Sequence, residues 1–287
     1  MTDSNQTMNI TKAQQVGMCE EKCAFSYKYQ TSSNCIASNL GDFIKFTYDE
    51  QTTPPAYFNN IVYKVQEINL YSPSIHRYNG QKVAAELVIR HFSTSSGAPL
   101  LVCIPMTNAG IITEGSNITN QLITQVVEKP LNNGDPAMKV NIDNYNLTQV
   151  IPDKPYFYYF KNDMHYIAFG VMDALSISND LMTKLRSLIT EPMRVLAPRA
   201  SEVFFNKEGP LAYGADSMDG EIYIDCQPTG NSQETEEVTF DQPGSTFESF
   251  DDILNNPIFY FLLLTVIIYI IIYVIFNLDV YIGGGNK

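Results

Sequence analysis

The sequence predicts a mainly β domain with a few short helices, followed by an acidic linker and one membrane-spanning helix. Three observations predict this arrangement. Runs rich in β-branched and aromatic residues, separated by Gly, Pro and Asn, recur through residues 1–228. Residues 229–256 carry several acidic residues and no Lys or Arg. Residues 257–279 contain a long apolar run, and residues 280–287 form a short tail.

The β runs of the first segment define the expected elements. The expected strands are Asp42–Tyr48, Ile61–Tyr71, Lys82–His91, Leu100–Met106, Tyr156–Tyr159, Tyr166–Asp173 and Glu221–Asp225. A helix is predicted over Asn179–Leu188, because Ser178 is a good N-cap and Leu residues recur on one helical face. A second helix is predicted over Ile118–Val127. The length of the segment suits one large domain.

The most distinctive motif is the segment from Val65 to Phe92, VQEINLYSPSIHRYNGQKVAAELVIRHF. It contains Pro73-Ser74, His76, Asn79-Gly80 and Glu86 in an order and spacing that resembles the central hairpin of the α-carbonic anhydrases. The resemblance implies that family's fold, a central, twisted, mostly antiparallel sheet with a few short helices.

Weaker likenesses to the same family occur in order along residues 8–226. They are Met8-Asn9-Ile10, Phe25-Ser26-Tyr27, Asn39-Leu40-Gly41, Phe46, Ile151-Pro152, Tyr156–Tyr159, Phe169–Val171, Ser176–Ser178, Leu185-Arg186, Asn206 and Pro210.

The resemblance implies that Asn69, Tyr71 and Val88 occupy the positions of the family's three zinc-ligand histidines. Side chains alternate along a strand, so Asn69 and Tyr71 point the same way, and Val88 on the second, antiparallel strand joins them. A catalytic zinc needs three protein ligands and an open position for water. Asn is a poor zinc ligand, neutral Tyr is poorer, and Val is none. We therefore expect a pseudoenzyme with no metal, no cofactor and no catalytic residue.

The positions that support the zinc site in the family are partly kept. Glu86 stands where the family's carboxylate orients a ligand histidine, and His76 stands at a structural position. Without a metal, Glu86 is expected to bond to a neighbouring residue. The family's loop with a hydroxide-orienting threonine corresponds to Phe160–His165, which is shorter and has no threonine. The other histidines, His91 and His165, show no spacing that suits a replacement site.

The run Ile258–Leu278 contains no Asp, Glu, Lys or Arg. About 20 helical residues cross a bilayer core, so this run predicts a transmembrane helix. Tyr260, Tyr269 and Tyr273 are its amphipathic aromatic residues, and Tyr260 lies near one end, as an interfacial anchor does. Because Met1–Ile10 lacks the apolar core of a secretory signal, we expect a tail-anchored protein whose domain faces the cytosol.

The segment 229–256 is acidic and rich in Ser and Thr, so it is expected to be a solvated spacer with little intrinsic structure. An alternative is that its apolar residues dock onto the chain's own domain or onto a partner. These residues are Phe240, Phe247, Phe250, Ile253 and Leu254.

The formal net charge is −13 and the sequence pI is about 4.6. Such a charge argues against nucleic acid and sulfated glycans as partners. A zinc-less, membrane-anchored relative on poxvirus particles binds glycans and needs a basic face. The basic residues that offer such a patch here are Arg77, Lys82, Arg90, Arg194 and Arg199. The expected partners are the lipid bilayer and other virion or coat proteins.

Five cysteines occur, and their odd number and the polar N-terminus favour free thiols. The spacing of Cys19 and Cys23 suits a metal pair, but no second pair lies nearby. A bridge from either residue to Cys35 is the alternative in an oxidising environment.

Three functions remain as hypotheses. The first is a membrane-tethered structural or docking module, and the resemblance suggests a minor capsid or membrane protein of a large DNA virus that bridges inner membrane and coat. The second is an attachment protein that binds a ligand on a host surface. The third is an active zinc lyase with a rebuilt site, which the residues argue against.

Overall fold

The structure is a computed structural model, and it describes residues 7–19, 22–95, 97–189 and 197–213. The chain divides into two compact units, Met1–Tyr223 and Ile224–Lys287. All described residues belong to the first unit, which is mainly β, as the sequence predicts.

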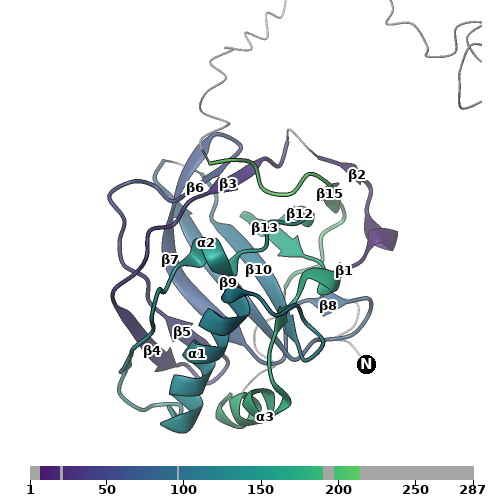
Figure 1. Cartoon of the computed structure of the whole chain (residues 1–287). Coiled ribbons are helices and arrows are strands. Elements are labelled where there is room, and N and C mark those ends of the chain that lie inside the picture. Colours follow the sequence, from purple (N-terminus) through teal and green to yellow (C-terminus); the bar gives the residue numbers. More distant parts are fainter. Residues whose placement is uncertain (1–6, 20–21, 96, 190–196, 214–287) are drawn as a thin grey trace, which may run out of the picture. The chain divides into compact units, whose positions relative to one another are not determined.

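The fold is built on one large mixed sheet, in which the described strands follow the order β11-β4-β5-β7-β9-β10-β13-β12-β15-β2 (Figure 1). Three further strands join it beside this path, and β1 pairs with β8 in a separate small sheet. The strands are β1 Asn9–Ile10, β2 Gly17–Met18, β3 Phe25–Tyr27, β4 Cys35–Asn39, β5 Ile44–Phe46, β6 Ala56–Phe58, β7 Ile61–Tyr71, β8 Arg77–Tyr78, β9 Ala85–Ser93, β10 Leu100–Thr107, β11 Met138–Val140, β12 Tyr156–Lys161, β13 Met164–Phe169, β14 Leu175–Ser176 and β15 Phe204–Asn206.

The centre of the sheet consists of the long strands β7, β9 and β10. They pair antiparallel, so the predicted hairpin is confirmed. β10 pairs with β13 in parallel, and β15 pairs with β2 in parallel. The sheet is therefore mixed, although most of its pairs are antiparallel.

Three short α-helices lie over one face of the sheet (Figure 1): α1 Glu114–Glu128, α2 Leu147–Val150 and α3 Asn179–Leu188. The α3 prediction is confirmed at both ends, and the Ser178 side chain accepts a hydrogen bond from the Leu181 N–H at 3.2 Å. α1 begins earlier than predicted, because the Thr113 side chain caps it by accepting from the Ser116 N–H at 3.1 Å. Capping of this kind satisfies donors that a helix start leaves free.

The two faces of the sheet pack two separate apolar clusters. The face under the helices includes Ile68, Leu87, Val102 and Ile167. The opposite face carries the positions that the sequence resemblance predicts for zinc ligands. Its cluster includes Met8, Ile10, Tyr71, Ile75, Tyr78, Val88, Cys103, Phe157, Tyr159 and Tyr166. The N-terminal strand β1 and residues 197–203 cover part of this second face.

Several predicted boundaries were wrong. The predicted strand Tyr166–Asp173 is β13, which ends at Phe169, and Val171–Asp173 form a 3-10 helix closed by a hydrogen bond from Asp173 N–H to Gly170 O. The supposed loop Phe160–His165 is instead a tight hairpin between β12 and β13. Its turn residues Asn162 and Asp163 have φ of 53° and 54°. Asn and Asp tolerate this left-handed backbone, so they suit a two-residue turn.

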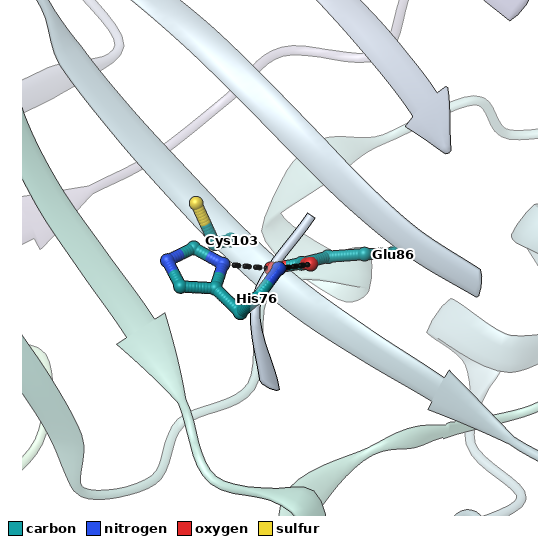
Figure 2. Close-up of side chains that lie close together, drawn as sticks. All are labelled: His76, Glu86 and Cys103. Atoms are coloured by element: carbon teal, nitrogen blue, oxygen red, sulfur yellow. Dashed lines mark hydrogen bonds and ion pairs between the residues drawn. The ribbon is translucent and has the colours of Figure 1, made fainter. Parts of the chain in front are cut away.

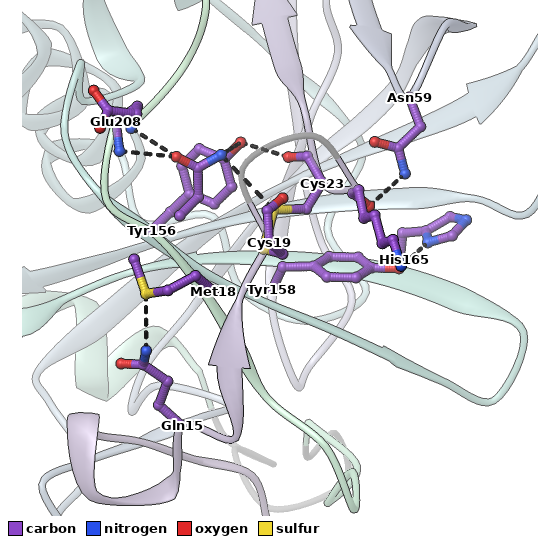
Figure 3. Close-up of a disulfide and its surroundings, with 12 residues drawn as sticks. Gln15, Met18, Cys19, Cys23, Asn59, Tyr156, Tyr158, His165 and Glu208 are labelled. Carbon is purple, nitrogen blue, oxygen red and sulfur yellow. Dashed lines mark hydrogen bonds between the residues drawn. A yellow bond between two sulfur atoms is a disulfide. The ribbon is translucent and has the colours of Figure 1, made fainter. Parts of the chain in front are cut away.

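The cysteines also differ from the prediction, because Cys19 and Cys23 form a disulfide (Figure 3). The backbone N–H of Cys23 bonds to the carbonyl oxygen of Cys19 at 2.9 Å, which brings the two side chains together. The expectation of free thiols and the alternative bridges to Cys35 are therefore wrong for this pair. Cys35 and Cys103 are free, as predicted, and both are buried.

Among the residues that the structure describes, no helix is long and apolar enough to cross a membrane. The predicted strand Glu221–Asp225, the linker 229–256 and the apolar run Ile258–Leu278 lie outside the described residues.

We expect Gly115→Ala to destabilise the domain by about 1–3 kcal/mol through overpacking. A Cβ atom at Gly115, in the first turn of α1, would collide with the Gln149 carbonyl oxygen and lie 2.8 Å from the Cα of Val150. Urea unfolding followed by circular dichroism measures the change. The control is Gly17→Ala, whose Cβ would meet its nearest atom at 3.7 Å. Equal stability of both variants would contradict the close packing of α1 on α2.

Candidate functional site

The three residues of the expected zinc site lie on neighbouring strands at the centre of the sheet. Asn69 of β7 is directly paired with Val88 of β9, which is in turn paired with Cys103 of β10. Tyr71 lies two residues beyond Asn69 on the same face. The sequence prediction that these side chains gather on one face is therefore confirmed.

The chemistry at these three positions does not suit a metal. The side chains are nearly inaccessible, with exposed fractions of 5% for Asn69, 8% for Tyr71 and 2% for Val88. The Asn69 Nδ2 donates to Glu67 Oε1 at 3.0 Å, and its Oδ1 is buried without a hydrogen-bond partner among the described residues. Burial, followed by the charges of nearby acidic groups, raises the pKa of Tyr71 well above its usual value, so the phenol stays neutral.

A zinc ion with catalytic water does not fit this donor set. Such a site needs three nitrogen, sulfur or carboxylate ligands and one open position. Here the three positions supply one amide oxygen, one neutral phenol and one alkyl group. The ring of Phe43 also packs against Tyr71, with ring centroids 5.1 Å apart.

Beside these residues lies a closed hydrogen-bond network around the carboxylate of Glu86 (Figure 2). Glu86 Oε2 accepts from the backbone N–H of His76 at 3.0 Å. Its Oε1 accepts from His76 Nδ1 at 2.5 Å and from the hydroxyl of Tyr78 at 2.9 Å. His76 Nε2 bonds to the hydroxyl of Tyr159 at 2.6 Å. Glu86 and His76 are completely buried, so the prediction that Glu86 bonds to a neighbour is confirmed.

The network keeps Glu86 ionised inside the protein. Burial alone would raise the pKa of Glu86, but attraction to His76 and the hydrogen bonds from His76 and Tyr78 lower it below its usual value. Burial and the charge of Glu86 raise the pKa of Tyr78 well above the ordinary range. The Glu86 carboxylate thus accepts these hydrogen bonds, and His76 and Tyr78 donate them.

Cys103 completes a second possible metal-binding group, because its Sγ and the ligand atoms of His76 and Glu86 lie within 4.8 Å of one another (Figure 2). Both ring nitrogens of His76 and both oxygens of Glu86 already have partners. Burial, and then the charge of Glu86, raises the pKa of the Cys103 thiol well above its usual value. A metal needs the thiolate and free donors, so this arrangement favours the hydrogen-bonded network.

Only part of this network can be predicted from the sequence. Glu86, His76 and Tyr159 lie in the family-like segments, whereas no motif marks Tyr78 or Cys103. The turn between β8 and β9 brings the hydroxyl of Tyr78 to Glu86, and the pairing of β10 with β9 brings Cys103 near it. The remaining histidines are not part of the network. His91 bonds to Tyr29 and Leu100, and His165 bonds to Tyr158.

We expect Glu86→Gln to destabilise the domain by about 3–5 kcal/mol at neutral pH, because it removes one partner of a buried pair. Glu67→Gln is the control, since Glu67 is a half-buried carboxylate of the same sheet. Because the folded-state pKa of Glu86 is lowered, its stabilisation is present above the unfolded value of 4.5 and is lost as the pH falls through the folded value. Chemical unfolding at several pH values measures both effects, and equal losses in the two variants would contradict the special role of Glu86.

His91 predicts a second pH dependence. The carbonyl of Leu100 accepts from Nδ1–H, so Nε2 accepts from the hydroxyl of Tyr29, and burial lowers the pKa of His91 from 6.5 to about 4. The unfolded chain takes up this proton at higher pH, so the free energy of unfolding should fall as the pH drops from 6.5 to 4. The slope for one group is at most about 1.4 kcal/mol per pH unit.

His91→Gln should flatten this slope, and it is measured by urea unfolding across the same pH range. His165→Gln is the comparison: burial also lowers the pKa of the half-buried His165, so this variant should flatten the slope less than His91→Gln does. A slope that His91→Gln leaves unchanged would rule out this histidine as the source.

Comparison with known proteins identifies the fold. No protein-family model and no curated protein sequence matches the chain. Among solved structures, dioscorin complexed with ascorbate matches with a TM-score of 0.52 and 13% identity over 70% of this chain and 84% of that one.

Two carbonic anhydrases match similarly. The enzyme Cah3 of Chlamydomonas reinhardtii, in complex with acetazolamide, has a TM-score of 0.52 and 15% identity, over 70% of this chain and 89% of that one. The α-carbonic anhydrase of Photobacterium profundum has a TM-score of 0.51 and 13% identity, over 72% of this chain and 90% of that one. At these identities the likeness shows the fold alone: the described part of this chain has the α-carbonic anhydrase fold.

Proposed function

We propose that this chain is a non-catalytic protein with the α-carbonic anhydrase fold, tethered to a membrane and used as a structural or docking module. The observation that carries the proposal is the closed sheet face at Asn69, Tyr71 and Val88. Its side chains are buried and supply no set of zinc ligands. Carbon dioxide hydration by a zinc-bound hydroxide requires both the ligands and an open position.

The preserved network beside this face supports a structural use of the fold. His76 and Glu86 keep their hydrogen bonds to each other and to the tyrosines around them. A carboxylate that no longer has a metal ligand to orient still joins strand β9 to the turn before it. The fold therefore keeps the interactions that hold the sheet together, while the metal-binding chemistry is missing.

The membrane anchor and the viral location in this proposal are inferred from the sequence. The uncharged run Ile258–Leu278 has the length of a membrane span, and the acidic segment 229–256 would separate it from the domain. In this proposal the domain faces the cytosol and, in a large DNA virus with an internal membrane, bridges that membrane and the coat as a minor capsid protein. The bilayer and coat proteins are its partners.

The test is the zinc content and activity of the full-length protein purified in detergent with zinc in the growth medium. We expect substoichiometric zinc by mass spectrometry and no acceleration of carbon dioxide hydration in a stopped-flow assay. One zinc per chain together with hydration activity would overturn the non-catalytic part of the proposal.

The triple variant Asn69→His/Tyr71→His/Val88→His is the positive control for zinc binding in the same assay. These three histidines would lie on one face of two paired strands, so we expect this variant to bind zinc at micromolar concentration, whereas Asn69→His alone should not. A correctly folded triple variant that binds no zinc would show that these positions do not form the metal site of this fold.

The docking part has its own test, cross-linking mass spectrometry on the intact membrane or particle that carries the protein. We expect dominant cross-links from residues 8–226 to a coat or scaffold protein. A domain without such links, which external protease removes from the intact particle, would instead favour the attachment function.

A further inference from the structure

A groove of about 340 Å³ is lined by residues at the beginnings of α1 and α3, and none of Asn69, Tyr71 and Val88 lines it. Its volume falls in the range of small-molecule sites, roughly 300–1,000 Å³. Side-chain amides dominate its lining, contributed by Asn108, Asn117, Asn120 and Asn179. No acidic, basic or aromatic residue lines it.

The amides retain hydrogen-bonding capacity. Asn120 Nδ2 donates to Ser176 O at 3.0 Å, whereas its Oδ1 is buried without a partner within the described part of the chain. Asn108 Nδ2 donates to Asn179 Oδ1 at 3.1 Å, which leaves the amide oxygen of Asn108 and the amide nitrogen of Asn179 for a ligand. Asn117 is exposed, and it makes one long contact, 3.4 Å, with Glu114.

In contrast, backbone groups of Ser176 and Ile177 in the groove already take part in hydrogen bonds within the protein. The N–H of Ser176 bonds to Ile111 O at 3.2 Å, and the N–H of Ile177 bonds to Thr107 O at 3.0 Å. The Ser176 carbonyl oxygen accepts from Asn120. A peptide that adds a strand needs free backbone donors and acceptors, so an extended peptide is disfavoured here.

The chemistry of the lining selects the ligand. An ion requires a countercharge, and no residue of the lining supplies one. Each amide offers both donors and an acceptor in a fixed plane, which matches the neighbouring hydroxyls of a sugar, since each hydroxyl also donates and accepts. Ile112, with 80% of its surface exposed, adds an apolar wall for the C–H face of a sugar ring. We propose that the groove between α1 and α3 binds an uncharged saccharide.

This proposal does not rest on the structural function proposed above. The strong negative charge opposes sulfated glycans, but it does not oppose neutral ones. The ligand of the groove would therefore be unrelated to the zinc-dependent reaction of carbonic anhydrases.

The first experiment screens the full-length protein, in a zwitterionic detergent without a sugar head group, against an array of uncharged oligosaccharides of glucose, galactose, mannose and N-acetylglucosamine. The strongest binder is then titrated calorimetrically at low and high salt. We expect a Kd of about 1 mM or tighter, and one that salt does not change. The absence of any binder, or affinity that fades with salt, would overturn the proposal.

The second experiment locates the site with matched variants. Asn108→Ala/Asn117→Ala removes two exposed amides of the groove and should weaken binding about fivefold or more, since each lost hydrogen bond lowers the affinity at least about twofold. Asn132→Ala/Asn133→Ala removes two exposed amides of the loop after α1 and should leave the affinity unchanged. Equal affinity of both double variants would place the saccharide elsewhere.

A measurement on the unaltered protein keeps the test independent of variant folding. Hydrogen exchange with and without the bound oligosaccharide should show added protection in residues 107–120 and 175–182. Protection confined to other parts of the domain would contradict the groove as the binding site.

Discussion

The interaction on which this fold depends is the burial of one carboxylate, that of Glu86, at the centre of a sheet to which the described residues contribute thirteen strands. An isolated buried charge is very costly, so the surrounding chain must supply donors. His76 supplies two and Tyr78 supplies one, and Tyr159 holds the far side of the imidazole. Through these bonds a single side chain of β9 holds the turn before it and strand β8, and His76 extends the link to strand β12.

This arrangement separates two roles that coincide in a zinc enzyme. The charge network needs His76, Glu86 and the tyrosines, whereas metal binding needs three ligands on β7 and β9. The strands can therefore hold this register with Asn69, Tyr71 and Val88 at the positions proposed for the ligands. One cost at these positions is the buried Asn69 Oδ1, which lacks a donor among the described residues. Such an acceptor costs roughly 1–3 kcal/mol.

The elements that could be predicted from the sequence are those with a strong local pattern. Strand β7 and helix α3 were predicted at their observed ends, because β-branched alternation and a Ser N-cap mark them. The predicted end of β13 was wrong. The apolar residues Val171 and Met172 continue the hydrophobic run of the strand, although the backbone turns there into a 3-10 helix. Cys103 comes near Glu86 only through the pairing of β10 with β9, and Tyr78 only through the turn between β8 and β9. The Cys19–Cys23 bridge depends on a local backbone hydrogen bond that spacing alone does not reveal.

The lengths of the two edge strands affect how copies of the domain behave when they lie close together. Among the residues that the structure describes, the order ends in β11, with three residues, and in β2, with two. A long free edge presents a row of unpaired backbone groups that invites another sheet to join, and short edge strands are one way in which proteins avoid this. Copies of the domain gathered side by side on a single surface would therefore have little edge through which to fuse their sheets, and each could remain a separate folded unit at high local concentration.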